Sequence, residues 1–373
     1  MTIDNNIPQG YKQTELGIIP EDWNIKSIGE FLSIGNGHDY KGKSFGNIPV
    51  YGTGGIITHI DDYLYDGQTI CIGRKGTIDK PIFHSGKIWT VDTLYYTYNF
   101  IDIEVKFIYY LLLTIDWMSL NEATGVPSLT SDRIKQITLA LPPIAEQRAI
   151  AEALSDVDGL IAALDKKIAK KRLIKQGAMQ QLLTGKTRLP GFTDKWVEKK
   201  LGKISHIKTG SRNGDQAVEN GKYPFFVRSQ KVYAIDTYSF DGEAILVPGE
   251  GGIGNIFHYI NGKFDFHQRV YKISDFANEV CGKFIYFYMS RYFGEYALSL
   301  TVKATVDSLR LPTFEEFVIH MPSNIKEQQA IATILSDMDK EIADLEAQRD
   351  KYRLLKTGMM QNLLTGQIRL KIE

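Results

Sequence analysis

The chain has 373 residues and is 43% hydrophobic, with 20 Tyr and 18 Phe, which is enough for more than one globular core. Its 44 basic and 44 acidic residues cancel, so it lacks the basic surplus of most free-standing nucleic-acid-binding proteins, although local basic patches are still allowed. No basic and apolar export signal opens the chain, and no apolar run reaches the roughly 20 residues of a membrane span, so we expect a cytoplasmic protein with no membrane contact.

Residues 1–141 are predicted to form a first globular domain. Short segments rich in β-branched and aromatic residues, such as residues 69–72 and 88–91, lie between Gly and Asn residues and indicate strands. A helical pattern covers roughly residues 105–120. The Pro-Pro sequence at residues 142–143 then closes the domain.

Residues 142–185 are predicted to form a long helix. Proline at the first helical position is a common start signal, and only Gly177 interrupts the pattern before Thr184. Gly185 is expected to cap the C-terminal end, because glycine readily adopts the left-handed conformation that ends many helices.

Residues 186–321 repeat the plan as a second globular domain. A strand is predicted at residues 244–247 and a helix near residues 283–298. Pro322 closes this domain.

A second long helix falls within residues 322–373. Asn324 is expected to cap its start, with Glu327 three residues later as the reciprocal partner of a capping box. Gly366 is expected to cap its end.

The two long helices are copies of one another. Residues 146–185 align with residues 327–366 without a gap at a constant offset of 181, and 23 of the 40 positions are identical. The domains repeat more faintly, at offsets that drift from 173 at Trp23 to 180 at Ser128. An internal repeat decides the architecture. The predicted fold is therefore α+β, with two similar mixed α/β domains separated by two long helices.

Apolar residues in both helices alternate at spacings of three and four, which is typical of a coiled-coil core. The alternative is that each helix lies flat on its own domain, but lysines such as Lys166 and Lys170 on the far side favour a narrow seam. The predicted seam residues are Leu154, Val157, Ile161, Leu164 and Ile168 in the first helix, and Leu335, Met338, Ile342 and Leu345, followed by Arg349 and Tyr352, in the second.

The chain order is domain, helix, domain, helix. If the second helix pairs with the first it must run back along it, so we expect an antiparallel coiled coil with a pseudo-twofold axis. A 40-residue helix is about 60 Å long, so the two domains are expected at opposite ends of a rod. Two similar but unlike domains at a fixed spacing suit an asymmetric bipartite DNA target whose spacer follows the length of the rod.

Several sequence motifs carry a resemblance to a known family. In the first copy they are Thr-Glu-Leu-Gly-Ile-Ile-Pro-Glu-Asp-Trp at residues 14–23, Pro-Pro at 142–143 with Glu-Gln at 146–147, and Leu-Leu-Thr-Gly at 182–185. The second copy has Pro322, Glu-Gln at 327–328 and Leu-Leu-Thr-Gly at 363–366, but it enters its domain through Arg-Leu-Pro-Gly-Phe at 188–192. With these motifs, essentially the whole chain resembles the specificity subunit of type I restriction-modification enzymes.

The resemblance implies two target-recognition domains that read double-stranded DNA and are separated by conserved helices. It also implies that these helices dock two methyltransferase subunits, and that restriction subunits join the larger complex. Under this interpretation the chain is a non-catalytic recognition and assembly subunit that needs no cofactor.

Base readout needs side chains with paired hydrogen-bonding groups, such as Arg for guanine and Asn or Gln for adenine. The candidate contacts lie in polar loops where the two domains differ, and the alternative for each is an ordinary solvated loop residue. In the first domain they are Lys41, Lys43, Ser44, Thr53, Arg74, Lys75 and Thr77. In the second domain they are Ser211, Arg212, Asn213, Arg228, Ser229, Gln230, Lys231, Gln268, Arg269 and Lys303.

Signals of other chemistry are weak. Residues 249–254 look like a dinucleotide fingerprint, but a strand-like segment follows where a pyrophosphate-binding helix should begin. His84 and His258 are expected in the core or in turns, because no cluster of carboxylates or cysteines accompanies them as a metal site requires.

Cys71 and Cys281 are expected to be buried reduced thiols. The sequence holds neither a Gly-x-x-x-x-Gly-Lys phosphate loop nor an Asn/Asp-Pro-Pro-aromatic methyltransferase signature, so catalysis is expected in partner chains.

Two other functions stay open on sequence alone. A nuclease or methyltransferase with its own active site would need a further domain, and the two domains and two helices already use the length of the chain. A protein scaffold that never contacts DNA is compatible with the sequence, but the basic and Gly-rich loops would then need another explanation.

Overall fold

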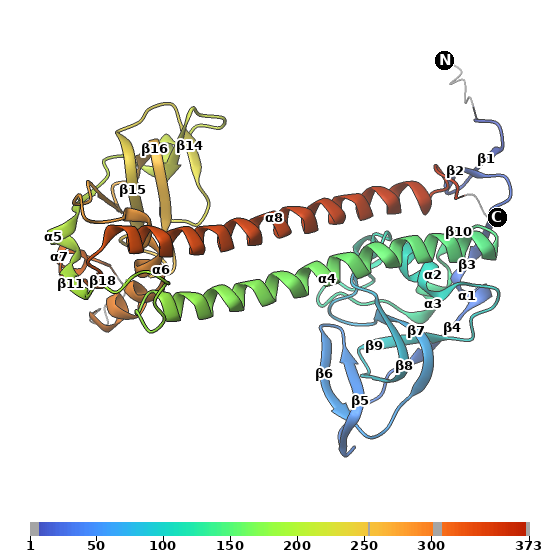
Figure 1. Cartoon of the computed structure of the whole chain (residues 1–373). Helices are drawn as coiled ribbons and strands as arrows, with labels where there is room; N and C mark the ends of the chain where they lie inside the picture. Colours follow the sequence, from blue (N-terminus) through green and yellow to red (C-terminus); the bar gives the residue numbers. More distant parts are fainter. Residues whose placement is uncertain (1–6, 253, 301–307, 371–373) are drawn as a thin grey trace. The chain divides into compact units, whose positions relative to one another are not determined.

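The computed structural model describes residues 7–252, 254–300 and 308–370. The chain forms two compact units, Met1–Leu164 with Gln348–Glu373 (unit 1) and Asp165–Ala347 (unit 2). Each unit contains one globular domain and parts of both long helices, α4 (Ile144–Leu182) and α8 (Ile325–Leu363) (Figure 1). The two units group residues that contact each other in space. The limits predicted from the sequence divide the chain into four consecutive segments instead, and they remain a prediction.

Unit 1 is built on a mixed sheet of six strands. Their order is β4 (Ser33–Asn36), β9 (Leu94–Tyr98), β7 (Tyr65–Gly73), β8 (Ile82–Thr90), β5 (Phe45–Gly52) and β6 (Gly55–Ile60), with β5 and β8 parallel and the other neighbours antiparallel. Two short pairs flank it, β1 (Tyr11–Thr14) with β2 (Gly17–Pro20) and β3 (Asn24–Ser27) with β10 (Thr138–Leu141). The remaining helices are α1 (Ile28–Phe31), α2 (Val105–Leu112), the 3-10 turn η1 (Trp117–Leu120) and α3 (Ser131–Lys135).

Unit 2 repeats this sheet strand for strand. The order is β12 (His206–Thr209), β17 (Val270–Ser274), β15 (Phe240–Pro248), β16 (His258–Phe266), β13 (Tyr223–Phe226) and β14 (Tyr233–Ile235), again with one parallel pair, β13 and β16. A flanking pair joins β11 (Trp196–Lys200) to β18 (Val318–Pro322). The helices are α5 (Leu201–Ile204), the 3-10 turn η2 (Gly214–Gln216), α6 (Gly282–Leu300) and α7 (Leu311–Glu315). The predicted α+β class with two similar mixed domains is therefore confirmed.

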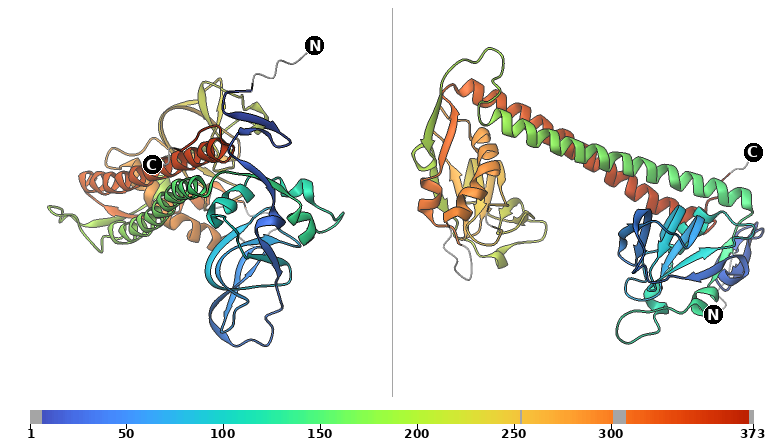
Figure 2. Two further views of the ribbon diagram at one scale, coloured as in Figure 1. Left: turned by 90° about the vertical axis from the view of Figure 1, so that its right-hand side faces the viewer. Right: turned by 90° about the horizontal axis from the view of Figure 1, so that it is seen from below.

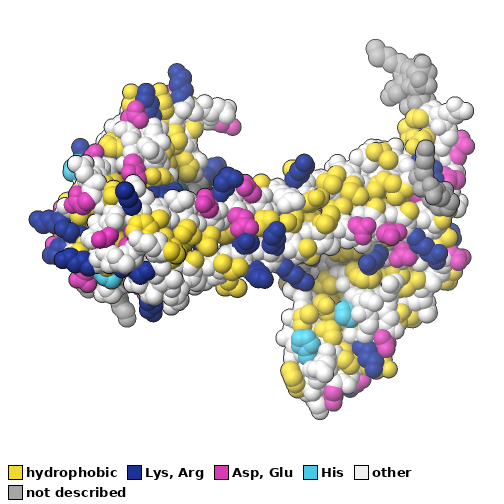
Figure 3. Space-filling view, in the orientation of Figure 1, with side chains coloured by type: hydrophobic (Ala, Val, Ile, Leu, Met, Phe, Trp, Pro, Cys, Tyr) yellow, Lys and Arg dark blue, Asp and Glu magenta, His cyan; other side chains and the backbone are white. Residues whose placement is uncertain are grey.

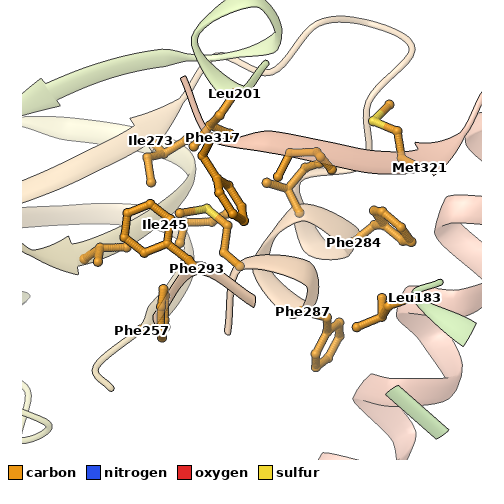
Figure 4. Close-up of a cluster of buried hydrophobic side chains, with 14 of the residues drawn as sticks. Leu183, Leu201, Ile245, Phe257, Ile273, Phe284, Phe287, Phe293, Phe317 and Met321 are labelled. Carbon is orange, nitrogen blue, oxygen red and sulfur yellow. The ribbon is translucent and has the colours of Figure 1, made fainter. Parts of the chain in front are cut away.

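One helix packs against each sheet and forms the core. In unit 2, Phe284 and Phe287 of α6 are fully buried in a cluster with Ile245 of β15 and Ile273 of β17 (Figure 4). Leu183, just after α4, belongs to the same cluster. Unit 1 has the equivalent core, in which α2 packs against β7 and the residues that follow α8 join in. The last five residues of β7 and of β15 are buried, as their continuous apolar runs suggest.

The ends of several helices differ from the sequence predictions. The helix expected at residues 105–120 stops at Leu112, because Asp116 accepts a hydrogen bond from the backbone N–H of Ser119 and starts the separate turn η1. The helix expected near residues 283–298 is α6 and is confirmed. Gly185 and Gly366 have φ angles of +68° and +73°, so both C-terminal caps are as predicted.

The capping box predicted for α8 is only half formed. Asn324 Oδ1 accepts a hydrogen bond from Lys326 N at 3.0 Å, as a cap should. The prediction for Glu327 is wrong, because its carboxylate binds Arg188 and not the backbone of Asn324. The sequence signature is present, but a tertiary ion pair takes the side chain.

In each unit, an arginine that follows the Leu-Leu-Thr-Gly motif of one long helix binds the Glu-Gln motif at the start of the other. In unit 2, Arg188 follows α4 and binds the buried Glu327 at the start of α8, with Nε–Oε1 and Nη2–Oε2 distances of 2.6 and 2.7 Å. In unit 1, Arg369 follows α8 and binds the buried Glu146 with the same two distances. Paired N–H···O contacts of this kind are among the strongest that arginine makes. We call these two contacts the junction pairs.

The neighbouring glutamines are also structural. Gln147 donates to the carbonyl of Pro142 at 2.9 Å and accepts from Glu104 N at 3.0 Å. Gln328 donates to the carbonyl of Pro322 at 2.8 Å and accepts from the backbone of Cys281 at 2.8 Å. Each glutamine therefore fixes the start of its long helix to the domain beside it.

Helices α4 and α8 pack side by side in each unit and run in opposite directions (Figures 1 and 2). In unit 2, Lys171 pairs with Glu341 at 2.7 Å and Lys175 pairs with Asp339, so the residue number in α8 falls as that in α4 rises. In unit 1, Lys356 pairs with Asp158 at 2.7 Å. The expected antiparallel arrangement is confirmed within each unit.

The residues predicted for the seam are buried or partly buried, and their assignment to the seam remains a prediction. Leu154 and Leu335 are fully buried and also belong to the cores of their units, so the first turns of each helix pack on the adjoining domain as well. Of the other residues predicted for the seam, Val157, Ile168, Ile342 and Leu345 are buried, while Ile161, Leu164, Met338, Arg349 and Tyr352 are partly buried.

Candidate nucleic-acid interface

The loop after β7 carries two adjacent basic side chains of the first domain. Arg74 and Lys75 are exposed, and their backbone N–H groups donate to the carbonyl of Thr93 at 2.8 and 3.2 Å. On the other side of the loop, Leu129 N donates to Arg74 O at 2.9 Å and Lys75 forms a β-bridge with Ser128. The loop is therefore fixed by two neighbouring segments.

Each domain has a pocket beside basic side chains. The pocket of the first domain measures about 510 Å³ and is lined by Arg74, Lys75, Tyr95, Ala123, Val126, Ser128, Leu129 and Thr130. The Arg74 guanidinium lies 5.9 Å from the centre of the Tyr95 ring. Thr53 lies beside the same loop, since a Cβ added to Gly76 would be 3.4 Å from its hydroxyl, and Thr77 is partly buried there.

The other candidates of the first domain lie in the loop before β5. Lys41, Lys43 and Ser44 are exposed. Lys43 pairs with Asp62 at 2.7 Å and lies 5.0 Å from the centre of the Trp89 ring. Among the described residues, these three share no hydrogen bond with the Arg74 loop, so they form a second, separate group.

In the second domain, three charged residues from three loops meet. Arg228 follows β13, Glu250 follows β15 and Arg269 precedes β17. Arg228 Nη1 lies 3.3 Å from Glu250 Oε2, and Arg269 binds the same carboxylate. The hydrogen bond from Arg269, together with the charge of Arg228, holds the pKa of Glu250 below its ordinary value, so the carboxylate is ionised. We call these residues the Arg228–Glu250–Arg269 cluster.

The three residues of this cluster occupy positions equivalent to those of the Arg74 loop and its neighbours in the first domain. The parallel pairs place Tyr51 and Phe226 at equivalent positions, so Thr53 corresponds to Arg228. Lys75 bridges to Ser128 as Glu250 bridges to Ser308, and Arg74 N binds Thr93 O as Gly249 N binds Arg269 O. The two domains therefore share one backbone framework but have different side chains at Thr53/Arg228, Lys75/Glu250 and Thr93/Arg269.

The pocket of the second domain measures about 320 Å³ and is lined by Gly214, Val227, Arg228, Ser229, Tyr233 and His267. His267 Nδ1 accepts a hydrogen bond from the backbone N–H of Arg269 at 3.0 Å. Burial and the charges of Arg228 and Arg269 lower the pKa of His267, so the ring is neutral at pH 7 and can accept this bond.

Arg212 and its neighbours differ in role. The Arg212 guanidinium donates to the buried Asp265 and to Thr237, both at 3.0 Å, so this arginine supports the fold. Ser211 and Asn213 are exposed, and Gln268 donates to Asn213 Oδ1 at 2.7 Å.

The remaining candidates belong to the loop after β13. Ser229 donates to the carbonyl of Lys231 at 2.8 Å, and the Lys231 ammonium lies 5.0 Å from the centre of the Tyr233 ring. Gln230 is exposed. Lys303 lies outside the described residues.

The weaker signals find structural explanations. In residues 249–254, Glu250 is paired with arginines, and the strand β16 comes next where a nucleotide site would need a helix. His258 contacts the carbonyl of Ser229 and His84 contacts that of Lys87, at 3.0 and 3.1 Å. Within the described ranges, no group of His, Cys, Asp or Glu could hold a metal ion, and no helix is long and apolar enough to cross a membrane.

The two cysteines are both free thiols. Cys71 is buried, which raises the pKa of its thiol to about 12. Cys281 is only partly buried, so the expectation of burial holds for Cys71 alone.

Sequence reasoning missed Glu250, the central residue of the cluster, because it was considered only as part of a nucleotide fingerprint. A signal was available. Lys75 stands three residues after the strand predicted at 69–72, and Glu250 stands three residues after the strand predicted at 244–247, so the repeat places both in the same loop.

Comparisons with known proteins agree with this architecture. The model of the type I restriction modification DNA specificity domain matches residues 20–171 and again residues 193–352. The MjaVIII specificity subunit of Methanocaldococcus jannaschii is 25% identical, over 95% of this chain and 94% of its own. The putative MjaX specificity subunit of the same organism is 23% identical over 97% of both chains.

A solved structure shows the same fold. The crystal structure of a type I restriction-modification S subunit from M. genitalium covers 100% of this chain and 99% of its own, with a TM-score of 0.73 and 15% identity. The two matches of the family model together span most of the chain, one for each domain and most of the helix that follows. The chain thus belongs to the type I restriction-modification DNA specificity family, as a non-catalytic specificity subunit with two target-recognition domains.

Proposed function

We propose that this chain reads an asymmetric bipartite target in double-stranded DNA, one half-site for each recognition domain. One observation carries the proposal: the two domains share a backbone framework but present Thr53, Lys75 and Thr93 in one and the Arg228–Glu250–Arg269 cluster in the other. A shared framework with different polar side chains fits two domains that bind the same kind of ligand and read different sequences.

The loops have the chemistry for DNA. Arginine reads guanine through two N–H groups, lysine and threonine contact phosphates or bases, and most of the candidate side chains are exposed. Because the chain has no net charge, the basic side chains of these loops would attract DNA only close to the loops themselves. Partner subunits of the complex would supply further positive charge toward the DNA backbone.

The long helices are proposed to dock two methyltransferase subunits, which restriction subunits then join. Leu173 of α4 and Leu354 of α8 are 69% and 75% exposed and stand at equivalent positions of the repeat, at the offset of 181. Ile174 and Leu355, the next residues, are also exposed. Apolar side chains gather along the C-terminal part of α8 (Figure 3). Two equivalent apolar surfaces, each exposed, suit two copies of one partner.

Co-purification tests the docking surface. We expect the double variant Leu173→Ala/Leu354→Ala to retain far less tagged methyltransferase than the wild-type chain, because both apolar surfaces are reduced. The control is Lys167→Ala/Gln348→Ala, which changes two exposed residues on another side of the same helices. Equal retention by both variants would contradict the proposed surface.

DNA binding by the purified complex tests the recognition role. We expect the chain with its methyltransferase to retain only a subset of random duplexes, and that subset should share one bipartite sequence. A complex that retains no duplex would favour the protein scaffold instead. A chain that cleaves or methylates DNA without a partner would show that it has an active site of its own.

A further inference from the structure

The backbone that carries Glu250 is fixed on two sides before any ligand binds. Gly249 N donates to Arg269 O at 2.8 Å, and Leu309 N donates to Gly249 O at 2.7 Å. Glu250 itself forms a β-bridge with Ser308. A Cβ on residue 249 would lie 2.9 Å from the Tyr271 ring, so glycine at this position allows the loop its close approach to β17. The carboxylate of Glu250 therefore has a defined place.

The two arginines around this carboxylate are only partly engaged. Their side chains are 47% and 53% exposed, while that of Glu250 is 22% exposed. In the part of the chain that the structure describes, only Nη1 of each guanidinium bonds to another side chain. The Nε and Nη2 groups of Arg228 and Arg269 can therefore bind a second partner, and guanine accepts two N–H groups at O6 and N7.

A fixed carboxylate makes such an arginine a better reader. The guanidinium is a planar fork, so holding one edge restricts the orientation of the other edge. Side-chain freedom that is already lost in the free protein is not lost again on binding. An isolated ion pair on a surface would contribute little, but here one anchored carboxylate orients two readers.

The internal repeat supports this role. The equivalents of Arg228, Glu250 and Arg269 in the first domain are Thr53, Lys75 and Thr93, so all three positions differ together. The carboxylate of Glu250 occurs in the domain that has both arginines. In the first domain, which has threonines at the two arginine positions, Lys75 takes the place of the carboxylate.

We propose that Glu250 is a positioning residue that holds Arg228 and Arg269 as a paired reader of guanine in the half-site of the second domain. The inference rests on the proposed function and deepens it. It requires two G·C pairs in that half-site, one for each arginine. The half-site of the first domain does not depend on Glu250.

Methylation sequencing of cells that express the chain with its methyltransferase tests the inference. A bidentate contact discriminates between bases by about 5- to 150-fold, so Arg228→Gln and Arg269→Gln should each relax one G·C position by a factor in this range. Glu250→Gln should weaken discrimination at both positions, by roughly fivefold or more, and leave the other half-site unchanged. The control is Asp241→Asn, an exposed carboxylate at the opposite end of β15, and it should keep the wild-type motif.

Thermal melting of each purified variant separates readout from folding, and all four should melt close to the wild type. A wild-type motif in which neither half-site contains two G·C pairs would overturn the inference. So would a Glu250→Gln motif identical to that of Asp241→Asn. If the wild-type chain directs no bipartite methylation at all, the proposed function fails as well, and this result is distinct from the other two.

Discussion

At the scale of single residues, the junction pairs give the glutamate of each Glu-Gln motif a structural role. Glu146 and Glu327 are almost completely buried, and each is neutralised by an arginine that lies 223 residues later or 139 residues earlier in the chain. Glu146 also accepts a hydrogen bond from Trp23 Nε1 at 3.2 Å. A buried carboxylate that loses its cation is costly, so the repeat preserves both partners.

Arg369→Ala is predicted to lower the free energy of unfolding by about 2 kcal/mol. The value lies below the roughly 3–5 kcal/mol for breaking a fully buried pair, because the Arg369 side chain is 36% exposed and partly screened by water. Denaturant unfolding measures it. Arg369→Lys should lose less unfolding free energy, because lysine keeps the positive charge although it cannot make the paired N–H contacts. An unchanged stability of Arg369→Ala would contradict the structural role of the pair.

Residue types in the loops could be predicted from the sequence, but their partners could not. Arg74 and Lys75 are exposed as expected. Arg212 looked the same in sequence, yet its guanidinium binds the buried Asp265, 53 residues away. The role of Glu250 depends on three loops that only the folded sheet brings together. Loop geometry, which sequence patterns do not encode, decides which cations face solvent.

At the scale of elements, the order of the strands in each sheet was not predicted, and the long helices were the most predictable features. Their periodicities are strong, and the glycine caps mark their ends. The spacing of the predicted seam continues from apolar residues to lysines. Lys175 and Lys356 take seam spacing and pair with Asp339 and Asp158, which are also equivalents in the repeat. Charged pairs in a seam specify register at some cost in stability.

Leu335→Ala is predicted to destabilise the chain by about 2–5 kcal/mol, because this fully buried residue of α8 belongs to the core of unit 2 and leaves a cavity. Leu354→Ala serves as the matched control. Its side chain is 75% exposed, so the change should stay within about 0.5 kcal/mol. Denaturant melts compare the two. Equal losses in both variants would contradict the assignment of Leu335 to the core and of Leu354 to the surface.

At the scale of the whole molecule, one duplicated unit yields two recognition domains joined by both long helices. The family model matches each copy once, and the two six-stranded sheets have the same order. The duplication could be read directly from the sequence because the helices keep a constant offset. The domains differ in loops, as at Lys75 and Glu250, and also in elements, since α2 has 8 residues and α6 has 19.

The length of the helices is predicted to set the spacer between the half-sites. Seven residues inserted after Leu164 and after Ala347, where each helix passes from one unit to the other, preserve the heptad and add about 10.5 Å. At about 3.4 Å per base pair, the recognised spacer should grow by about three base pairs while both half-sites stay the same. Methylation mapping of the variant measures this. A spacer of unchanged length would exclude a ruler function for the helices.

The most direct measurement is genome-wide methylation sequencing of cells that express the wild-type chain with its methyltransferase, against cells that express the methyltransferase alone. The account predicts a single motif with two unlike half-sites and a spacer of fixed length, present only when both chains are expressed. A contiguous motif, a motif with two identical half-sites, or the same methylation without this chain would contradict it.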